Sequence, residues 1–290
     1  MPLAVKFNLA LLAVFIVGFA GAGVVSHAML ADNARAEVLD SARMIMAQAL
    51  ASRSYTSTQV APLLRRLPDD DFIPQTVPAF AATEQFNALH SQFPDFAYKE
   101  ATLNPTNLRD KATDWEVDLV ERFRQYPAEK ELVVERETPT GRSLSLARPI
   151  RIEDPSCLTC HSTVDTAPQA LLKRYGPANG FGWQLHDVIG AQIVTVPMTL
   201  PERRADHAFW AFMSSMGGIF ILVFAFLNLL LAFIVVRRVT RFARLADEVS
   251  LGKLDAPEFP AAGKDELSRL ARSFNRMKKS LAHAIKMLEE

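Results

Sequence analysis

The sequence contains very little cysteine and carries no net charge. Its 290 residues include only two cysteines, and 32 basic residues balance 32 acidic ones. Two cysteines exclude the framework of several disulfides that stabilises small secreted domains. The even charge balance argues against nucleic acid as a partner, because chains that bind nucleic acid gather basic residues to neutralise phosphates. A domain built from this chain therefore needs its own hydrophobic core, or a covalent group held by the cysteines.

Charged residues are missing from two long stretches. Residues 7–25 are apolar except for Asn8, and residues 208–236 contain no Asp, Glu, Lys or Arg. A helix needs about 20 apolar residues to cross a bilayer, so both stretches are predicted transmembrane helices surrounded by membrane lipid. The first stretch could instead be a signal peptide, since Ala20-Gly21-Ala22 resembles a cleavage site. Only Lys6 precedes the apolar run, however, and the run has the length of a span, so we expect an uncleaved anchor.

Both cysteines lie in one motif, Cys157-Leu158-Thr159-Cys160-His161. C-x-x-C-H is the attachment signature of a c-type haem: each thiol adds to one vinyl group, and the histidine takes an axial position on the iron. A thioredoxin-type redox pair needs no histidine there, a structural disulfide joins positions further apart, and a zinc site needs about four ligands. We therefore predict one covalent haem c, attached to Cys157 and Cys160, with His161 as the proximal iron ligand.

The ligand on the other side of the iron is open, because the motif uses both cysteines. Met46 is one candidate, since it falls with Leu39, Ala42 and Leu50 on the apolar face of a helix predicted over residues 31–53. His90 and His186 are two others, and an open position that binds a diatomic gas is a further alternative. Three arginines are candidate partners for the haem propionates: Arg53, Arg148 and Arg151.

Basic residues predict how the chain is oriented in the membrane. The second apolar stretch is followed by Arg237, Arg238, Arg241 and Arg244. The positive-inside rule places such an end in the cytoplasm, together with the short N-terminus that carries Lys6. We therefore predict a bacterial inner-membrane protein with residues 1–6 and 237–290 in the cytoplasm and residues 26–207 in the periplasm. In bacteria haem is attached to C-x-x-C-H on the periplasmic side, which agrees with this orientation.

The pattern of residues 26–207 predicts an α+β domain. The helix over residues 31–53 continues the first span, and a break follows near residue 55. The capping box of Thr113 and Glu116 starts another helix, and Thr138-Pro139-Thr140-Gly141 joins two strands as a hairpin. Predicted strands cover residues 98–101, 131–137, 142–152 and 190–198, and a further helix covers 83–93. A few antiparallel strands with flanking helices are expected.

Several of these segments resemble a known family. They are Tyr98-Lys99-Glu100-Ala101-Thr102-Leu103-Asn104-Pro105-Thr106-Asn107, Asp114-Trp115-Glu116, Ala147-Arg148-Pro149-Ile150 and the cysteine motif. Their order and spacing are similar to those of the PAS-like, c-type-haem periplasmic sensor domains often found ahead of HAMP modules in bacterial receptors. The resemblance covers about residues 30–200. It implies a PAS-like antiparallel sheet with the haem held against it.

Residues 237–290 resemble a HAMP signalling linker. A first helix holds Phe242, Leu245, Ala246 and Val249, a connector contains glycine and proline, and Asp265-Glu266 opens a second helix. Apolar residues then repeat at intervals of three and four, and we call them the seam: Leu267, Leu270, Phe274, Met277, Leu281, Ala284 and Leu288. So narrow a stripe predicts a parallel bundle in a homodimer rather than a helix lying on the membrane.

Together these features predict a receptor and not an enzyme. It senses redox state or a small ligand, such as a gas, at the haem and signals through the HAMP domain to a cytoplasmic partner such as a kinase. The alternative is a membrane-anchored monohaem cytochrome, but an electron carrier does not need a cytoplasmic bundle. A receptor for a small organic ligand, with an incidental cysteine motif, is a third interpretation. No output domain precedes Glu290, so the partner is expected either as a separate protein or further along a longer chain.

Overall fold

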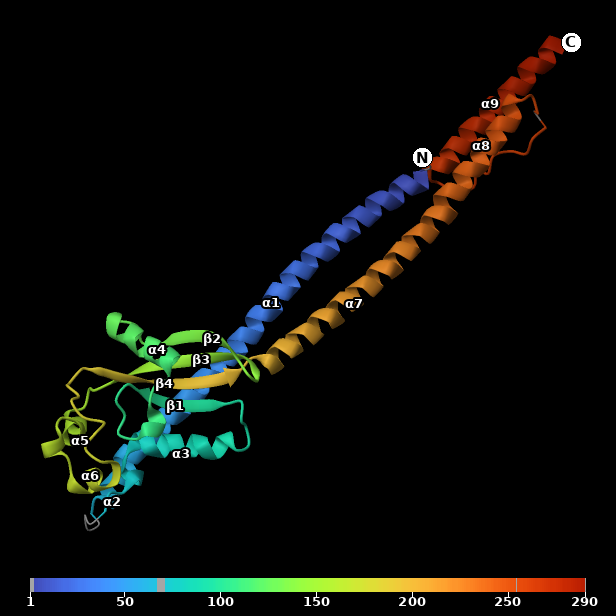
Figure 1. Cartoon of the computed structure of the whole chain (residues 1–290). Helices are drawn as coiled ribbons and strands as arrows, with labels where there is room; N and C mark the ends of the chain where they lie inside the picture. Colours follow the sequence, from blue (N-terminus) through green and yellow to red (C-terminus); the bar gives the residue numbers. More distant parts are fainter. Residues whose placement is uncertain (1–2, 67–70, 254, 290) are drawn as a thin grey trace. The chain divides into compact units, whose positions relative to one another are not determined.

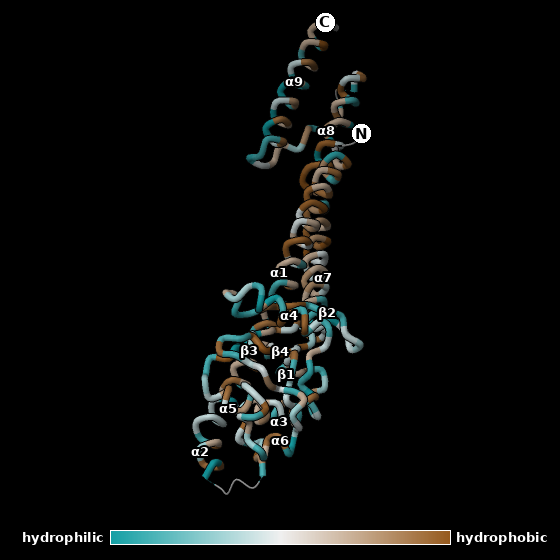
Figure 2. The backbone as a smooth tube through the Cα atoms, turned by 60° about the vertical axis from the view of Figure 1, so that its left-hand side comes forward, coloured by the Kyte–Doolittle hydropathy of each residue, from teal (hydrophilic) through white to brown (hydrophobic). Residues whose placement is uncertain are grey.

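Among the residues that the structure describes, two helices are long and apolar enough to cross a membrane (Figure 1). The computed structural model describes residues 3–66, 71–253 and 255–289, with side chains for 4–66, 71–253 and 255–287. Helix α1 spans Leu3–Tyr55, so the first span and the predicted helix over residues 31–53 are one continuous helix. Helix α7 spans Thr199–Leu230 and continues through the π-helical turn η6, Leu231–Val236. Hydrophobic residues concentrate along the apolar parts of both helices (Figure 2).

The chain divides into two compact units. One unit is His27–Ala208, and the other combines Met1–Ser26 with Phe209–Glu290. The first unit contains a four-stranded antiparallel sheet in the order β1-β4-β3-β2. The strands are β1 Ala97–Thr102, β2 Leu132–Thr138, β3 Gly141–Arg151 and β4 Val188–Pro197. The predicted α+β class and the hairpin between β2 and β3 are confirmed, since Thr138 pairs with Gly141.

Successive side chains of a strand point to opposite faces of the sheet, and here both faces are covered by helices. On one face, Leu144, Leu146 and Val194 form a core with α1 residues that include Val38, Ala42, Met46 and Ala49. On the other face, Ala147, Ala191 and Ile193 pack against α4, Asp114–Gln125. The predicted capping box starts α4: the backbone N–H of Thr113 donates to the Glu116 carboxylate at 2.7 Å. The sheet therefore lies between α1 and α4.

Three local predictions differ from the structure. The break expected near residue 55 is instead the π-helical turn η1, Thr56–Val60, which runs into α2, Ala61–Leu64. The hydroxyls of Thr56, Ser57 and Thr58 bond the carbonyls four residues earlier, and such bonds distort a helix without ending it. Helix α3 is Pro78–His90 and starts earlier than expected, because proline suits the first helical turn. Leu50, expected on the apolar face of α1, is 38% exposed, and Ala49 is buried instead.

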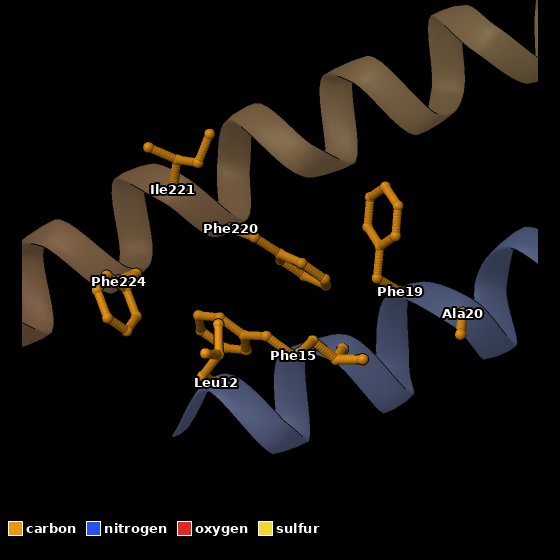
Figure 3. A pocket seen from close by; sticks show the side chains of 8 residues that line it. Leu12, Phe15, Phe19, Ala20, Phe220, Ile221 and Phe224 are labelled. Atoms are coloured by element: carbon orange, nitrogen blue, oxygen red, sulfur yellow. The ribbon is translucent and has the colours of Figure 1, made fainter. Parts of the chain in front are cut away.

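In the second unit, aromatic side chains of α1 and α7 pack together (Figure 3). The rings of Phe15 and Phe220 stack with their centroids 4.9 Å apart, and Phe224 meets Phe15 edge-on at 6.4 Å. These rings help to line an apolar cavity of about 410 Å³. Stacked and edge-on aromatic pairs add to the packing of the two helices where lipid replaces water.

The C-terminal residues form two helices, α8, Arg237–Ser250, and α9, Glu266–Glu289, as expected. Phe242 and Leu245 of α8 pack with Phe259 of the connector and Ala271 of α9. Asp265 caps α9 by accepting the N–H of Ser268 at 2.7 Å. Along the seam, Leu267 and Phe274 join this core, whereas Leu270, Met277 and Leu281 are exposed. The side chain of Leu288, the last predicted seam residue, lies outside those that the structure describes.

Candidate haem-attachment site

The cysteine motif forms a tight turn shortly after β3. A 3-10 turn, η4, Pro155–Cys157, leads directly into the single-turn helix α5, Leu158–His161. Residues three apart on a helical turn face the same side, so this backbone brings Cys157 and Cys160 to one side. Both are free thiols and both are half-buried. The turn thus presents two sulfur atoms that are available for thioether bonds.

The electrostatics of the two thiols differ from those of a redox pair. Burial raises the pKa of Cys157, Asp154 raises it further, and Arg53 acts in the opposite direction. Burial also raises the pKa of Cys160, against the effect of Arg65. Catalytic redox cysteines have a lowered pKa, because the thiolate is the reactive form. The raised pKa values therefore disfavour the thioredoxin-type alternative.

His161 is held by its Nδ1 atom. This atom lies 2.7 Å from the carbonyl oxygen of Gly180, and the imidazole stacks on the Trp183 ring with centroids 4.0 Å apart. A carbonyl only accepts, so Nδ1 carries the proton and Nε2 keeps its lone pair. Metal-binding histidines commonly donate their other ring N–H in this way. Burial lowers the pKa of His161, which favours the neutral imidazole that binds a metal.

The chain segment that follows β1 holds Gly180 in place. Its N–H donates to the Asn104 side chain at 3.2 Å, and the Asn104 amide donates to the Phe181 carbonyl at 3.3 Å. Gly180 has a φ of +88°, and a Cβ there would lie 2.1 Å from the Thr106 hydroxyl oxygen. Only glycine therefore fits between this turn and His161.

The two segments that support His161 can be recognised in the sequence, but the contact between them cannot. The sequence Asn104-Pro105-Thr106-Asn107 is typical of a turn, and residues 176–183 are rich in glycine. Their association was missed because Asn104 and Gly180 are 76 residues apart. The signal that could have found it is the density of glycine directly after the motif, since a loop with several positive φ values has a defined shape.

The donor set of the turn fits a covalent haem c. Cys157 and Cys160 supply two free thiols for thioether bonds, and Nε2 of His161 supplies an axial nitrogen. The support from Gly180 and Trp183 fixes the tautomer and the plane of the imidazole. These are the residues that would hold the group.

The three candidates for a distal ligand lie in different parts of the domain. Met46 is fully buried in the core between α1 and the sheet. The Nδ1 atom of His90 lies 3.0 Å from the Phe96 carbonyl. His186 has a φ of +73° and lines a cavity of about 350 Å³ together with two arginines. Met46 and His90 thus already have roles in packing and in hydrogen bonding, and a distal ligand stays a prediction.

The three candidate arginines also separate. Arg148 pairs with Glu131 at 2.9 Å, and Arg151 donates to two backbone carbonyls at 3.3 Å. Arg53 pairs with Glu100 and acts electrostatically on the thiol of Cys157. Of the three, Arg53 pairs with the more deeply buried carboxylate, since the Glu100 side chain is 6% exposed and that of Glu131 is 23% exposed.

Two family models match parts of the chain. Residues 31–197, more than half of the chain, match the model of the Tll0287-like family, and residues 230–283 match the HAMP domain. One similar solved structure is described as the cyanobacterial heme-protein Tll0287; it is 16% identical, with a TM-score of 0.38, over 52% of this chain and 94% of that chain. No curated protein matches the chain.

Two predictions from the sequence are thereby confirmed. The first is a family domain ahead of a HAMP module, which the Tll0287-like and HAMP models match, and the second is the α+β fold with two long apolar helices. The apolar helices together with the HAMP domain indicate a membrane protein. The HAMP match begins at residue 230, inside the second apolar stretch, so the module continues that helix. The chain belongs to the Tll0287-like family and carries a HAMP domain after its family domain.

Proposed function

We propose that the protein is a bacterial inner-membrane receptor with a haem c attached to Cys157 and Cys160 and His161 as the proximal ligand. The observation that carries the proposal is the bond of His161 Nδ1 to Gly180, which leaves Nε2 free next to two unpaired thiols. When bound, the haem supplies an iron that can change oxidation state or take a small ligand. His161, stacked on Trp183, is the side chain that would experience either change.

Both long helices are tied to the sheet that supports the site. Arg35 on α1 donates to Glu135 on β2 at 2.7 Å, and Glu135 accepts from Arg142 on β3 at 2.8 Å. Arg142 also reaches Glu202 on α7 at 2.5 Å. A change in the domain can therefore act on both helices, and the same helices contain the apolar stretches. Linked ion pairs of this kind are more effective than isolated surface pairs.

The C-terminal module supports a signalling output from a homodimer. Leu270 and Met277 of the seam are 45% and 56% exposed, although Leu267 and Phe274 pack in the core of the same chain. A second copy would cover the exposed side in a parallel four-helix bundle. In this proposal residues 26–207 are periplasmic, residues 237–290 are cytoplasmic, and the output acts on a partner such as a kinase. No catalytic step is assigned to the chain.

The second candidate is a membrane-anchored monohaem cytochrome that transfers electrons in the periplasm. The cysteine turn would serve both functions equally. The match of residues 230–283 to a HAMP domain favours the receptor, because such modules pass conformational change between helices and an electron carrier gains nothing from one.

Two measurements on the full-length protein test the proposal. The first is peroxidase staining of a denaturing gel, which detects covalent haem and should be lost in the C157A/C160A double variant. The second is the rate of crosslinking by a bismaleimide, which alkylates thiols and needs no oxidant, through a cysteine introduced at Leu270, in oxidised and reduced protein and with carbon monoxide or nitric oxide. A receptor should show a rate that depends on one of these conditions. Covalent haem combined with the same rate in all of them would favour the cytochrome.

A further inference from the structure

A cavity with a polar side and an apolar side lies where α4, the end of β3 and the start of β4 meet. It has a volume of about 350 Å³. Its apolar side is formed by Phe123, Pro127 and Val188, and the first and last of these are buried. Its polar side chains come from three separate segments of the chain: Arg124, Arg151, His186 and Asp187. The lining includes none of the described residues of the cysteine turn.

Arg151, the last residue of β3, brings a positive charge to the cavity. It forms no ion pair with any residue that the structure describes. Its Nη1 and Nη2 atoms donate to the carbonyls of His186 and Pro127, each at 3.3 Å. These bonds orient the guanidinium and leave its other N–H groups for a ligand. The register of β3 against β4 shifts between Ile150 and Arg151, and such bulges re-aim side chains next to active sites.

Arg124, in the last turn of α4, is the second cation. Its Nε donates to the carbonyl of Val188 at 2.9 Å, and its Nη1 pairs with Glu121 at 3.0 Å. The Glu121 side chain is 55% exposed, so solvent weakens its effect on the charge of Arg124. Asp187 is the acidic residue of the lining, and its carboxylate already accepts a backbone N–H at 2.9 Å. Two arginines against one aspartate leave the lining with one excess positive charge.

His186 adopts a backbone conformation that usually belongs to glycine. Its φ is +73°, and among the described residues it is the only one besides glycine with a positive φ. It is the third residue of a turn that the N–H of Asp187 closes by donating to the carbonyl of Gln184 at 3.2 Å. Glycine is the usual residue for a positive φ at this position, so a histidine costs conformational strain. The imidazole has no hydrogen bond or ion pair with any described residue, which leaves it available to a ligand.

We propose that this cavity binds a small organic monocarboxylate with a short apolar group. The two arginines bind the carboxylate, because planar guanidinium groups match it with paired hydrogen bonds. His186 donates a third hydrogen bond, and the apolar group lies against Phe123, Pro127 and Val188. One carboxylate also neutralises the excess positive charge. The inference goes beyond the proposed function and needs no haem, so a failure of either leaves the other standing.

The test is ligand-observed saturation-transfer NMR on the full-length protein in detergent. The probes are butyrate and benzoate, and butyramide and benzamide are their uncharged matches. A carboxylate should bind saturably with a Kd of about 1 mM or tighter, and its amide at least about tenfold more weakly, because the amide lacks the charge. Arg151→Gln should weaken carboxylate binding at least about tenfold. Arg122→Gln is the matched control, since Arg122 pairs with Glu129 outside the cavity, and it should change binding less than about twofold.

His186→Gly separates binding from folding. Glycine adopts a positive φ without strain, so the denaturation midpoint should not fall, whereas loss of the imidazole should weaken carboxylate binding.

Weaker binding in Arg151→Gln and His186→Gly, with an unchanged Arg122→Gln, supports the proposal. Three outcomes overturn it: neither carboxylate binds saturably, the amides bind as well as the carboxylates, or Arg151→Gln or His186→Gly binds like the wild type. If Arg151→Gln does not fold, Arg124→Gln takes its place under the same criteria.

Discussion

The Nδ1 atom of His161 lies 2.7 Å from the carbonyl oxygen of Gly180, and this contact makes the histidine a suitable iron ligand. It fixes the tautomer by placing the proton on Nδ1. It also links the histidine to Asn104, because the N–H of Gly180 donates to the Asn104 side chain. The proximal side of the site is thus built by three separate segments of chain, and each can be tested.

Gly180→Ala is expected to disturb both stability and the site. The new Cβ would lie 2.1 Å from the Thr106 hydroxyl oxygen, at a φ of +88°. Strain of this kind costs about 1–3 kcal/mol and should displace the carbonyl that holds His161. We expect a lower denaturation midpoint and altered optical bands of the haem-loaded protein. Gly176→Ala is the control: its φ is +78° but no atom lies near the new Cβ, so its midpoint should fall while its bands stay unchanged.

Substitution of Met46 can separate a core residue from an iron ligand. Met46 is fully buried between α1 and the sheet, so Met46→Ala should destabilise the domain by about 2–5 kcal/mol whether or not it binds iron. Met46→Leu keeps nearly the same volume and removes only the thioether. Altered oxidised and reduced spectra of Met46→Leu would show that the sulfur is a ligand. Wild-type spectra would exclude it.

Asp110 should make the stability of the domain depend on pH. Burial raises its pKa from 3.8 to about 6, although Arg109 opposes the shift. The folded state therefore binds the proton more tightly than the unfolded state, and the free energy of unfolding falls as pH rises from about 4 to about 6, by up to about 3 kcal/mol. Denaturant titrations at both ends of this range should show the decrease. In Asp110→Asn it should be smaller, and an equal decrease would mean that other groups cause it.

The seam should mediate contact between two copies of the chain. Leu270 and Met277 are exposed, whereas Arg272 donates to connector carbonyls and Lys279 pairs with Glu258. Single cysteines at the first two positions should form crosslinks between chains readily, and cysteines at the last two poorly. Equal crosslinking at all four positions would contradict a defined seam.

Phe274→Asp should weaken the C-terminal bundle and leave haem attachment intact. Phe274 stacks on Phe259 with ring centroids 5.2 Å apart, so the substitution removes an aromatic contact and adds a charge in its place. The expected loss is about 2–4 kcal/mol. Crosslinking through Leu270→Cys should fall in this background, while peroxidase staining stays at the wild-type level. Loss of staining would mean that the two parts of the chain do not fold independently.

Features that depend on residues close together in the sequence could be predicted from the sequence alone. Two stretches without charge specify helices long enough for a membrane, because the requirement concerns length and composition only. The spacing of Cys157, Cys160 and His161 specifies its own chemistry, and the capping box and the hairpin turn are likewise local. Each of these follows from bond geometry and from the burial of apolar side chains over a few residues.

Contacts between distant segments required the tertiary structure. Asn104 and Gly180 meet across 76 residues, and Arg53 and Glu100 meet across 47. The packing of α1 and of the loop after the motif against the sheet decides which polar groups become partners. The periodicity of the sequence does not predict these pairs. The sequence offered Arg53, Arg148 and Arg151 as equals. Packing placed one of them, Arg53, against the buried carboxylate of Glu100, because a buried charge is tolerated only where a partner compensates for the lost water.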